Sequence, residues 1–305
     1  MGVRGAMKIR LAAGAAVLGV AVATTGCGSG GPATSTADGK IRVVATTNVW
    51  GSVASAVAGD LAEVTSIMSD PAGDPHSYQL TPRDAATLAN AQLLLFNGGG
   101  YDEFVEQALG EGGEGPRVVQ AFELLAAKGT EHNEHVWYSL ATVGAVADEV
   151  ARQLGEIRPE STAAFTAGAK SFKDGLTGLT GRVEEVRQTH HGVTIVATEP
   201  LAHYLLTDAG LNDITPAQFV EAVEDETDPP AGAVAEIQSL LTRHQVTLVV
   251  HNPQTETPVV ADVLTKAREA QLPVVDLTET LPAGQDYLTW MTEQVEELSA
   301  AVSQR

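Results

Sequence analysis

Two short apolar runs, IRVVAT at residues 41–46 and VTIVAT at residues 193–198, decide the fold of this chain. Both runs are rich in Val and Ile and are too short for a typical helix, so each predicts a buried strand. Apolar runs that alternate with helical segments are typical of parallel sheets in α/β proteins. The pattern therefore predicts two α/β lobes. Further strands are expected at 63–68, 92–96, 117–119, 246–251 and 273–277, and helices at 49–58, 82–91, 140–154, 200–209, 232–243, 257–270 and 286–302.

A long polar stretch from Pro159 to about His190 separates the strands and helices of the first predicted lobe from those of the second. A helix that buries only one narrow stripe often bridges two lobes, so we expect a single long helix at 158–190 between lobes at 40–157 and 191–305. Four glycines in this stretch weaken the helix prediction by ~1 kcal/mol each relative to Ala. The sparse apolar positions are Phe165, Phe172, Leu176, Leu179, Val183 and Val186.

The N-terminus has the features of an export signal. Three basic residues precede an apolar run of 13 residues, LAAGAAVLGVAVA at 11–23. A transmembrane helix needs roughly 20 such residues, so the run is typical of a secretory signal peptide over 1–26. Cys27, the only cysteine, follows it and precedes GSGGPATSTADG. This arrangement indicates a bacterial lipoprotein with lipid on Cys27, anchored to the cell membrane, and a flexible tether over 27–39. An ordinary signal peptide, with Cys27 removed or free, is the alternative, and translation can start at Met1 or Met7.

The composition excludes some classes of function. Without residues 1–26 the chain holds 15 basic and 39 acidic residues, a formal charge of −24. Nucleic-acid phosphates need Lys and Arg, so we expect no nucleic-acid partner. The negative field instead attracts cations. Aromatic residues make up only 5% of the chain, which disfavours an aromatic cleft for sugars or drug-like molecules.

Four side chains of metal-ligand type lie where parallel sheets place their ligands, beyond the carboxyl ends of strands. His76 and Glu199 follow the strands predicted at 63–68 and 193–198, and Glu279 follows the strand at 273–277. His135 lies in the loop before the helix at 140–154. Each half of the chain supplies two residues, so a cleft between the lobes would bring all four together. Two imidazoles and two carboxylates suit a divalent transition metal, Zn²⁺ or Mn²⁺.

The chain resembles the periplasmic metal-binding proteins of zinc and manganese ABC importers. The likeness rests on VVATTNVWGSVASAVAG, DPHSYQLTPRDAATLANAQLLLFNGGGYDEFVEQ, HVWYSLATVGAVADEVARQL, VATEPLAHYLLTDAGL and PVVDLTETLPAGQDYLTWM, which are spread over nearly all of the mature chain. The DPHSYQLTP block and the NGGG after it are the most specific of these. The resemblance implies two parallel-sheet lobes joined by one long helix.

The same resemblance implies the ligand set His76, His135, Glu199 and Glu279. The third ligand of the family is His in zinc-type members and Glu in manganese-type members, and the fourth is normally Asp. Glu279 therefore departs from the pattern by one methylene, and a neighbour could replace it. His203, one helical turn after Glu199, and His251, at a strand end, are candidates for an alternate ligand or a supporting role.

The resemblance implies a binding protein without turnover. We expect a monomer that delivers its metal to an ABC permease and its ATPase. Two alternatives stay open: a metal-dependent hydrolase and an adhesin-like surface lipoprotein. A hydrolase would need an open coordination position and a general base, and the chain has no GxSxG, HExxH or P-loop motif. Zinc, manganese and iron are not distinguished, although we expect purified protein to retain zinc.

Overall fold

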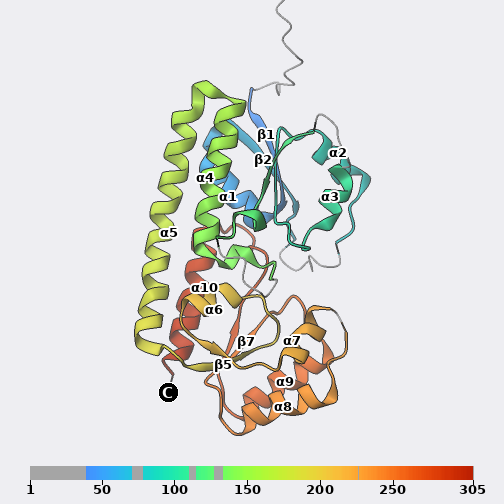
Figure 1. The fold of residues 1–305 in the computed structure, drawn as a ribbon, viewed down its shortest axis with the longest axis vertical. Coiled ribbons are helices and arrows are strands. Elements are labelled where there is room, and N and C mark those ends of the chain that lie inside the picture. The colour runs from blue at the N-terminus through green and yellow to red at the C-terminus, as the bar shows by residue number, and fades with distance from the viewer. Residues whose placement is uncertain (1–38, 71–77, 110–114, 127–132, 226, 305) are drawn as a thin grey trace, which may run out of the picture. The chain divides into compact units, whose positions relative to one another are not determined.

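Two four-stranded parallel sheets form the framework of the protein (Figure 1). The computed structural model describes residues 39–70, 78–109, 115–126, 133–225 and 227–304. The strand order is β2-β1-β3-β4 in the first sheet and β6-β5-β7-β8 in the second, so both lobes have one topology. The predicted fold class is confirmed. The strands are β1 (Ile41–Thr47), β2 (Ala62–Met68), β3 (Leu93–Phe96), β4 (Arg117–Gln120), β5 (Thr194–Ala197), β6 (Asn212–Asp213), β7 (Val249–His251) and β8 (Val274–Asp276).

Helices cover both faces of each sheet. Side-chain caps begin several of them: the Thr81 hydroxyl accepts the backbone N–H of Asp84, whose carboxylate accepts the Thr81 N–H in return, as expected for Thr followed by Pro82. The α-helices are α1 (Asn48–Ala58), α2 (Pro82–Ala89), α3 (Glu103–Leu109), α4 (Leu140–Ile157), α5 (Thr162–His190), α6 (His203–Asp208), α7 (Ala217–Glu224), α8 (Ala231–Thr242), α9 (Pro258–Glu269) and α10 (Tyr287–Val302). Short 3₁₀ turns lie at Gly59–Leu61, Phe122–Leu124, Val136–Tyr138 and Pro159–Ser161.

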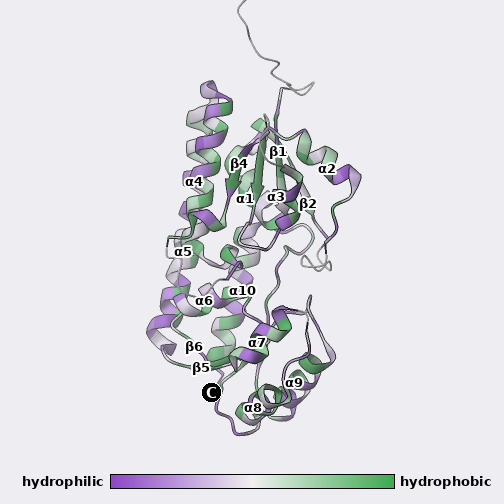
Figure 2. Cartoon of the chain, turned by 45° about the vertical axis from the view of Figure 1, so that its right-hand side comes forward, coloured by the Kyte–Doolittle hydropathy of each residue, from purple (hydrophilic) through white to green (hydrophobic). Residues whose placement is uncertain are grey.

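The two lobes share one hydrophobic core. Alternate residues of a strand point to opposite faces, so in β1 Val43 packs into the shared core and Val44 packs against α2 and α3. In β5, Ile195 likewise packs into the shared core and Val196 packs against α7, α8 and α9. The shared core includes residues of α1, α4, α5, α6 and α10, and it is continuous from one sheet to the other. Hydrophobic and hydrophilic residues alternate along α4, as expected for a helix with one buried face (Figure 2).

Helix α5 extends along both lobes (Figure 1). All six apolar positions predicted for its buried stripe are buried, together with Ala169. Two of its glycines permit close contacts: a Cβ at Gly168 would lie 2.3 Å from the Val57 carbonyl oxygen, and one at Gly175 would lie 2.5 Å from Leu288. At these two positions, glycine lets α5 approach α1 and α10.

The segment that leads into α10 joins the two halves of the chain. The Asn48 side chain donates to the Leu281 carbonyl oxygen at 3.0 Å and accepts the Leu281 N–H at 3.0 Å. The Tyr287 N–H donates to the Ser52 hydroxyl at 2.9 Å. Both partners on the first lobe belong to α1, so this segment is fixed to α1 on both sides of the loop before α10.

Some expectations differ from the structure. Only Val249–His251 pairs as a strand, although the run at 246–251 predicts a longer one. Helix α6 begins at His203 rather than at residue 200, and helices α3 and α7 were not predicted. In the described residues, no helix has both the length and the apolar character that crossing a membrane requires. The signal peptide, Cys27 and most of the tether lie outside the described residues, and the predicted domain boundaries stay a prediction.

Candidate metal site

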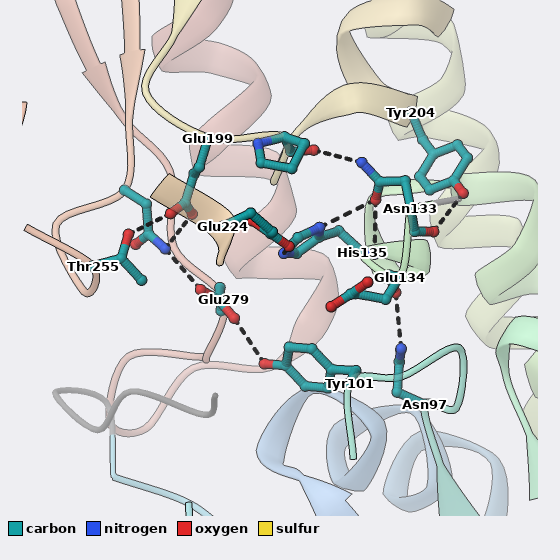
Figure 3. A network of polar contacts seen from close by, with 12 residues as sticks. Asn97, Tyr101, Asn133, Glu134, His135, Glu199, Tyr204, Glu224, Thr255 and Glu279 are labelled. Carbon is teal, nitrogen blue, oxygen red and sulfur yellow. Dashed lines mark hydrogen bonds and ion pairs between the residues drawn. The ribbon is translucent and has the colours of Figure 1, made fainter. Parts of the chain in front are cut away.

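Three of the four predicted ligands are buried close to the carboxyl ends of the strands. His135 is 0% exposed, Glu199 is 5% exposed and Glu279 is 1% exposed. Glu199 follows β5 by two residues and Glu279 follows β8 by three, while His135 immediately precedes the 3₁₀ turn Val136–Tyr138. His76 lies outside the described residues. Figure 3 shows the network of polar contacts around the three described side chains.

Asn133 orients the imidazole of His135. The Asn133 Oδ1 atom accepts the backbone N–H of His135 at 2.9 Å, and the Asn133 Nδ2 atom donates to the Pro200 carbonyl oxygen at 2.8 Å. These two bonds fix which end of the Asn133 amide is the acceptor. His135 Nδ1 lies 3.1 Å from that same Oδ1, so Nδ1 carries the proton and Nε2 presents a lone pair. A histidine that ligates a metal usually donates its other N–H in this way.

A third carboxylate faces the Nε2 atom of that imidazole. Glu224, the last residue of α7, places Oε1 at 3.8 Å from His135 Nε2 (Figure 3). This distance exceeds a hydrogen bond but is short enough for electrostatic attraction to a cation between the two groups. Sequence reasoning missed Glu224 because it missed α7, although Phe219 and Val223 have helical spacing and are both buried.

Neutral donors hold the two buried carboxylates. The Asn252 amide nitrogen donates to Glu199 Oε1 at 2.5 Å and to Glu279 Oε1 at 2.8 Å. The Thr255 hydroxyl donates to Glu199 Oε2, and the Tyr101 hydroxyl donates to Glu279 Oε2 at 2.8 Å. Tyr101 belongs to the first lobe, whereas both carboxylates belong to the second. The pair is therefore held close together by one nitrogen and connected across the lobes by one hydroxyl.

The NGGG loop that precedes Tyr101 has the backbone that its glycines allow. Gly98, Gly99 and Gly100 have φ values of 72°, 70° and 103°, which side chains with a Cβ rarely adopt. Asp102 closes this loop, because its carboxylate accepts the N–H groups of Asn97 and Gly98 at 2.7 Å each.

Asp102 is itself buried, at 1% exposed, and it also accepts the Thr46 hydroxyl at 2.7 Å. Burial raises the pKa of Asp102 to about 6, although these hydrogen bonds lower it in part. The Asn97 side chain donates to the Glu134 carbonyl oxygen at 2.8 Å, so the same loop supports the segment that carries His135.

The two additional histidines occupy different places. His203 begins α6 and lines a cavity of about 640 Å³ beside Glu199, whose other charged lining residues are Glu134, Asp213, Glu221, Glu224 and Asp225. His251 is buried at the end of β7, and its Nδ1 lies 2.8 Å from Asp276 Oδ1. The next residue in the chain is Asn252, which donates to both Glu199 and Glu279. A supporting role for either histidine stays a prediction.

Within the described residues, no three side chains of His, Cys, Asp or Glu are arranged closely enough to hold a metal ion. A site built from His135, Glu199 and Glu279 therefore needs a change of side-chain position, a ligand from outside the described residues such as His76, or both. What the described residues provide is one oriented imidazole nitrogen and two buried carboxylates. These donors suit a divalent transition metal.

Sequence reasoning also missed the supporting residues. Asn252 lies directly after β7, so the rule that found Glu199 and Glu279 also points to it. An amide carries no charge, so a search for imidazole and carboxylate ligands does not find it. Asn133 stands two residues before His135, a spacing typical of a side chain that accepts a backbone N–H two residues on. No sequence signal indicates that Tyr101 contacts Glu279, because 178 residues separate them.

Comparison with known proteins adds independent support. The profile of the family described as zinc-uptake complex component A, periplasmic, matches residues 43–301. The manganese-binding lipoprotein MntA of Bacillus subtilis (strain 168) is 29% identical over 244 residues, which cover 77% of this chain and 78% of that protein. The iron-binding protein YfeA of Yersinia pestis is 25% identical over 183 residues, which cover 57% of this chain and 58% of that protein.

Solved structures show the same fold. The laminin-binding protein Lmb of Streptococcus agalactiae, described as having adhesin and metal-transporting activity, aligns with a TM-score of 0.73 at 21% identity, over 87% of this chain and all of that one. The periplasmic zinc-binding protein TroA from Treponema pallidum aligns with a TM-score of 0.72 at 19% identity, with the same coverage. The family is one of extracytoplasmic components of uptake systems, so the resemblance and the prediction of a binding protein rather than an enzyme are confirmed. Because the family profile matches most of its length, the chain belongs to the family of periplasmic A components of zinc-uptake complexes.

Proposed function

We propose that the protein binds a divalent transition metal through His76, His135, Glu199 and Glu279 and delivers it to an ABC permease with its ATPase. The observation that supports this most directly is the buried pair Glu199 and Glu279, whose carboxylates share one donor nitrogen. Burying two carboxylates side by side is unfavourable unless hydrogen bonds and positive charge compensate them. A bound dication supplies that charge, and the Nε2 atom of the oriented His135 imidazole supplies a further ligand.

Three different metals appear in the names of similar proteins: manganese for MntA, iron for YfeA and zinc for TroA. A site of imidazole and carboxylate donors binds zinc more tightly than manganese in the usual order of stability. We propose that purified protein retains zinc, and that Glu199 favours manganese as the transported ion because a carboxylate is a harder ligand than a third imidazole.

The location of the protein follows from the same reasoning. We propose that the chain is cut before Cys27 and anchored to the cell membrane by lipid on that residue. The relatives named lipoproteins support this. We further propose that it works as a monomer with lobes at 40–157 and 191–305 and a bridging helix at 158–190. Replacement of Cys27 by Ser should release the protein from the membrane fraction, and light scattering should give the mass of one chain.

Elemental analysis of protein purified without chelator tests the metal-binding proposal, followed by competition with a chromophoric chelator. His76→Ala, His135→Ala, Glu199→Gln and Glu279→Gln should each lower the affinity for zinc at least tenfold. Two exposed residues provide matched controls: His191→Ala and Glu269→Gln should leave the affinity unchanged. Unchanged affinity in both Glu199→Gln and Glu279→Gln would contradict the proposed site.

A further inference from the structure

We propose that Asn252 is a positioning residue of the metal site, which sets the spacing of Glu199 and Glu279 before the metal arrives. This inference rests on the proposed function, because it takes the two carboxylates to be ligands. The Asn252 side chain does not bind the metal itself in this proposal. Its role is to hold each carboxylate through one N–H bond of the same amide group.

The first step of the argument is that the orientation of the Asn252 amide is determined. Its Oδ1 atom accepts the backbone N–H of Gln254 at 2.9 Å, so the nitrogen must point the other way. That nitrogen carries two hydrogens. Glu199 Oε1 and Glu279 Oε1 lie at 2.5 and 2.8 Å from it, one acceptor for each hydrogen. Asn252 is 1% exposed, so water does not compete for these bonds.

The second step concerns the remaining oxygens of the two carboxylates. Thr255 donates to Oε2 of Glu199 and Tyr101 donates to Oε2 of Glu279. Each carboxylate is therefore held at both oxygens and cannot rotate freely. A carboxylate oxygen has two lone-pair directions, so a bond from Asn252 does not by itself prevent that oxygen from binding a metal.

The third step is that this arrangement differs from a general packing role. A buried amide that only completes the fold would bond to the backbone, as the Oδ1 atom of Asn252 does. Among the described residues, its nitrogen instead donates to two side-chain carboxylates, which come from two different strand ends. The two ends of the Asn252 amide thus have different roles. The oxygen binds the backbone of the loop at Gln254, and the nitrogen sets the distance between the two carboxylates.

Two variants separate these functions experimentally. Asn252→Ser keeps a short side-chain acceptor for the Gln254 N–H but is too short to reach the carboxylates. Asn252→Leu removes both contacts at similar volume. Partners of metal ligands typically contribute 10–100-fold to metal affinity, so both variants should weaken zinc binding by about that factor. Both variants should also melt at a lower temperature without metal, because two buried carboxylates lose a donor, so zinc binding is measured well below the melting temperature of each variant. Asn90→Ser, at an exposed helix end, is the matched control.

The experiment uses the full chain, stripped of metal and titrated with zinc chloride in the presence of a chromophoric chelator, and then with cobalt(II) chloride. The visible absorption bands of bound cobalt report the ligand arrangement, so they should shift in Asn252→Ser. In a Glu279→Gln background, Asn252→Ser should weaken zinc binding by a clearly smaller factor, because one of the two groups it spaces is no longer a carboxylate. The same factor in both backgrounds, or an unchanged cobalt spectrum with unchanged zinc affinity, would overturn the inference. If Glu199→Gln and Glu279→Gln lose affinity for zinc while Asn252→Ser keeps it, only the role of Asn252 is rejected. If both glutamate variants keep their affinity for zinc, the proposed site itself is rejected.

Discussion

Replacement of Asp102 by Asn should change how the stability of the protein depends on pH. Burial raises the pKa of Asp102 to about 6 in the folded protein, against an ordinary value of 3.8. The folded state therefore binds a proton more tightly than the unfolded state does. The stability that this proton contributes is fully present below about pH 4 and is lost as the pH rises through about 6.

The size of the effect follows from the shift in pKa. A difference of about two pKa units corresponds to about 3 kcal/mol in the free energy of unfolding, at about 1.4 kcal/mol per unit. Asp102 is 1% exposed, so screening by water reduces this figure little. Asn cannot ionise, and the unchanged protein should lose up to about 3 kcal/mol relative to Asp102→Asn between pH 4 and pH 7.

Urea unfolding of metal-free protein with chelator, repeated at half-unit steps of pH, measures this difference. Taking the difference between the two proteins cancels the titration of all groups that do not contact Asp102. Asn can accept fewer bonds than the carboxylate that binds Thr46, Asn97 and Gly98, so the variant will also lose a part of its free energy of unfolding that does not depend on pH. The test is therefore how the difference in free energy of unfolding between the two proteins changes with pH, and not its absolute size.

Asp84 provides a control with the opposite sign. Partial burial raises the pKa of Asp84, but bonds from Thr81 and Tyr78 lower it more, and the net change is downward. Its contribution to stability is thus present above the ordinary pKa and lost as the pH falls. Relative to Asp84→Asn, the unchanged protein should gain stability as the pH rises through 4. A flat difference for Asp102→Asn over pH 4–7, or the same sign in both pairs, would refute the reasoning.

Three further predictions concern the site. Asn133→Leu should weaken zinc binding about 10- to 100-fold, because His135 Nδ1 loses the acceptor that fixes its proton; unchanged affinity in chelator competition would contradict this. Tyr101→Phe should lower the free energy of unfolding of metal-free protein by about 1.5–3 kcal/mol, the usual contribution of a hydrogen bond to a charged group such as Glu279, and urea unfolding measures it. Removal of metal should lower the melting temperature by several degrees, since a metal at about 100 times its dissociation constant stabilises by about 2.7 kcal/mol, while the radius of gyration from small-angle scattering should change little.

Periodicity predicted most of the fold because the relevant forces are local or follow from burial. The stripe on α5 was found residue by residue, since a helix that packs along one side must place its apolar residues three or four apart. The run at 246–251 shows the limit of this reasoning. Val246 and Leu248 are buried, but only Val249–His251 pairs as a strand. Apolar character indicates that a residue is buried, but it does not indicate which buried residues form backbone hydrogen bonds to a neighbouring strand.

The candidate site was predictable only where position along a strand determines proximity. Glu199 and Glu279 come together because β5 and β8 lie on either side of β7 in a parallel sheet, and the ends of such strands meet at one edge. Tyr101 and Glu224 reach the site through the packing of a loop and a helix from elsewhere in the chain. Their contacts depend on tertiary structure that no local pattern in the sequence contains.

The two lobes hold their proposed ligands by the same arrangement. Asn133 and Asn252 each accept the backbone N–H of the residue two positions on, and each amide so oriented holds the side chain of a proposed ligand. This arrangement restrains the proposed ligands within each lobe, so the remaining freedom is movement of one lobe against the other. The continuous core along α5 and α10 opposes such movement, as do the reciprocal bonds between Asn48 and Leu281. A wide opening would also break the bond from Tyr101 to Glu279, which leaves a buried carboxylate oxygen without that donor. Metal uptake by this chain should therefore depend on small displacements of side chains, and much less on a hinge between the lobes.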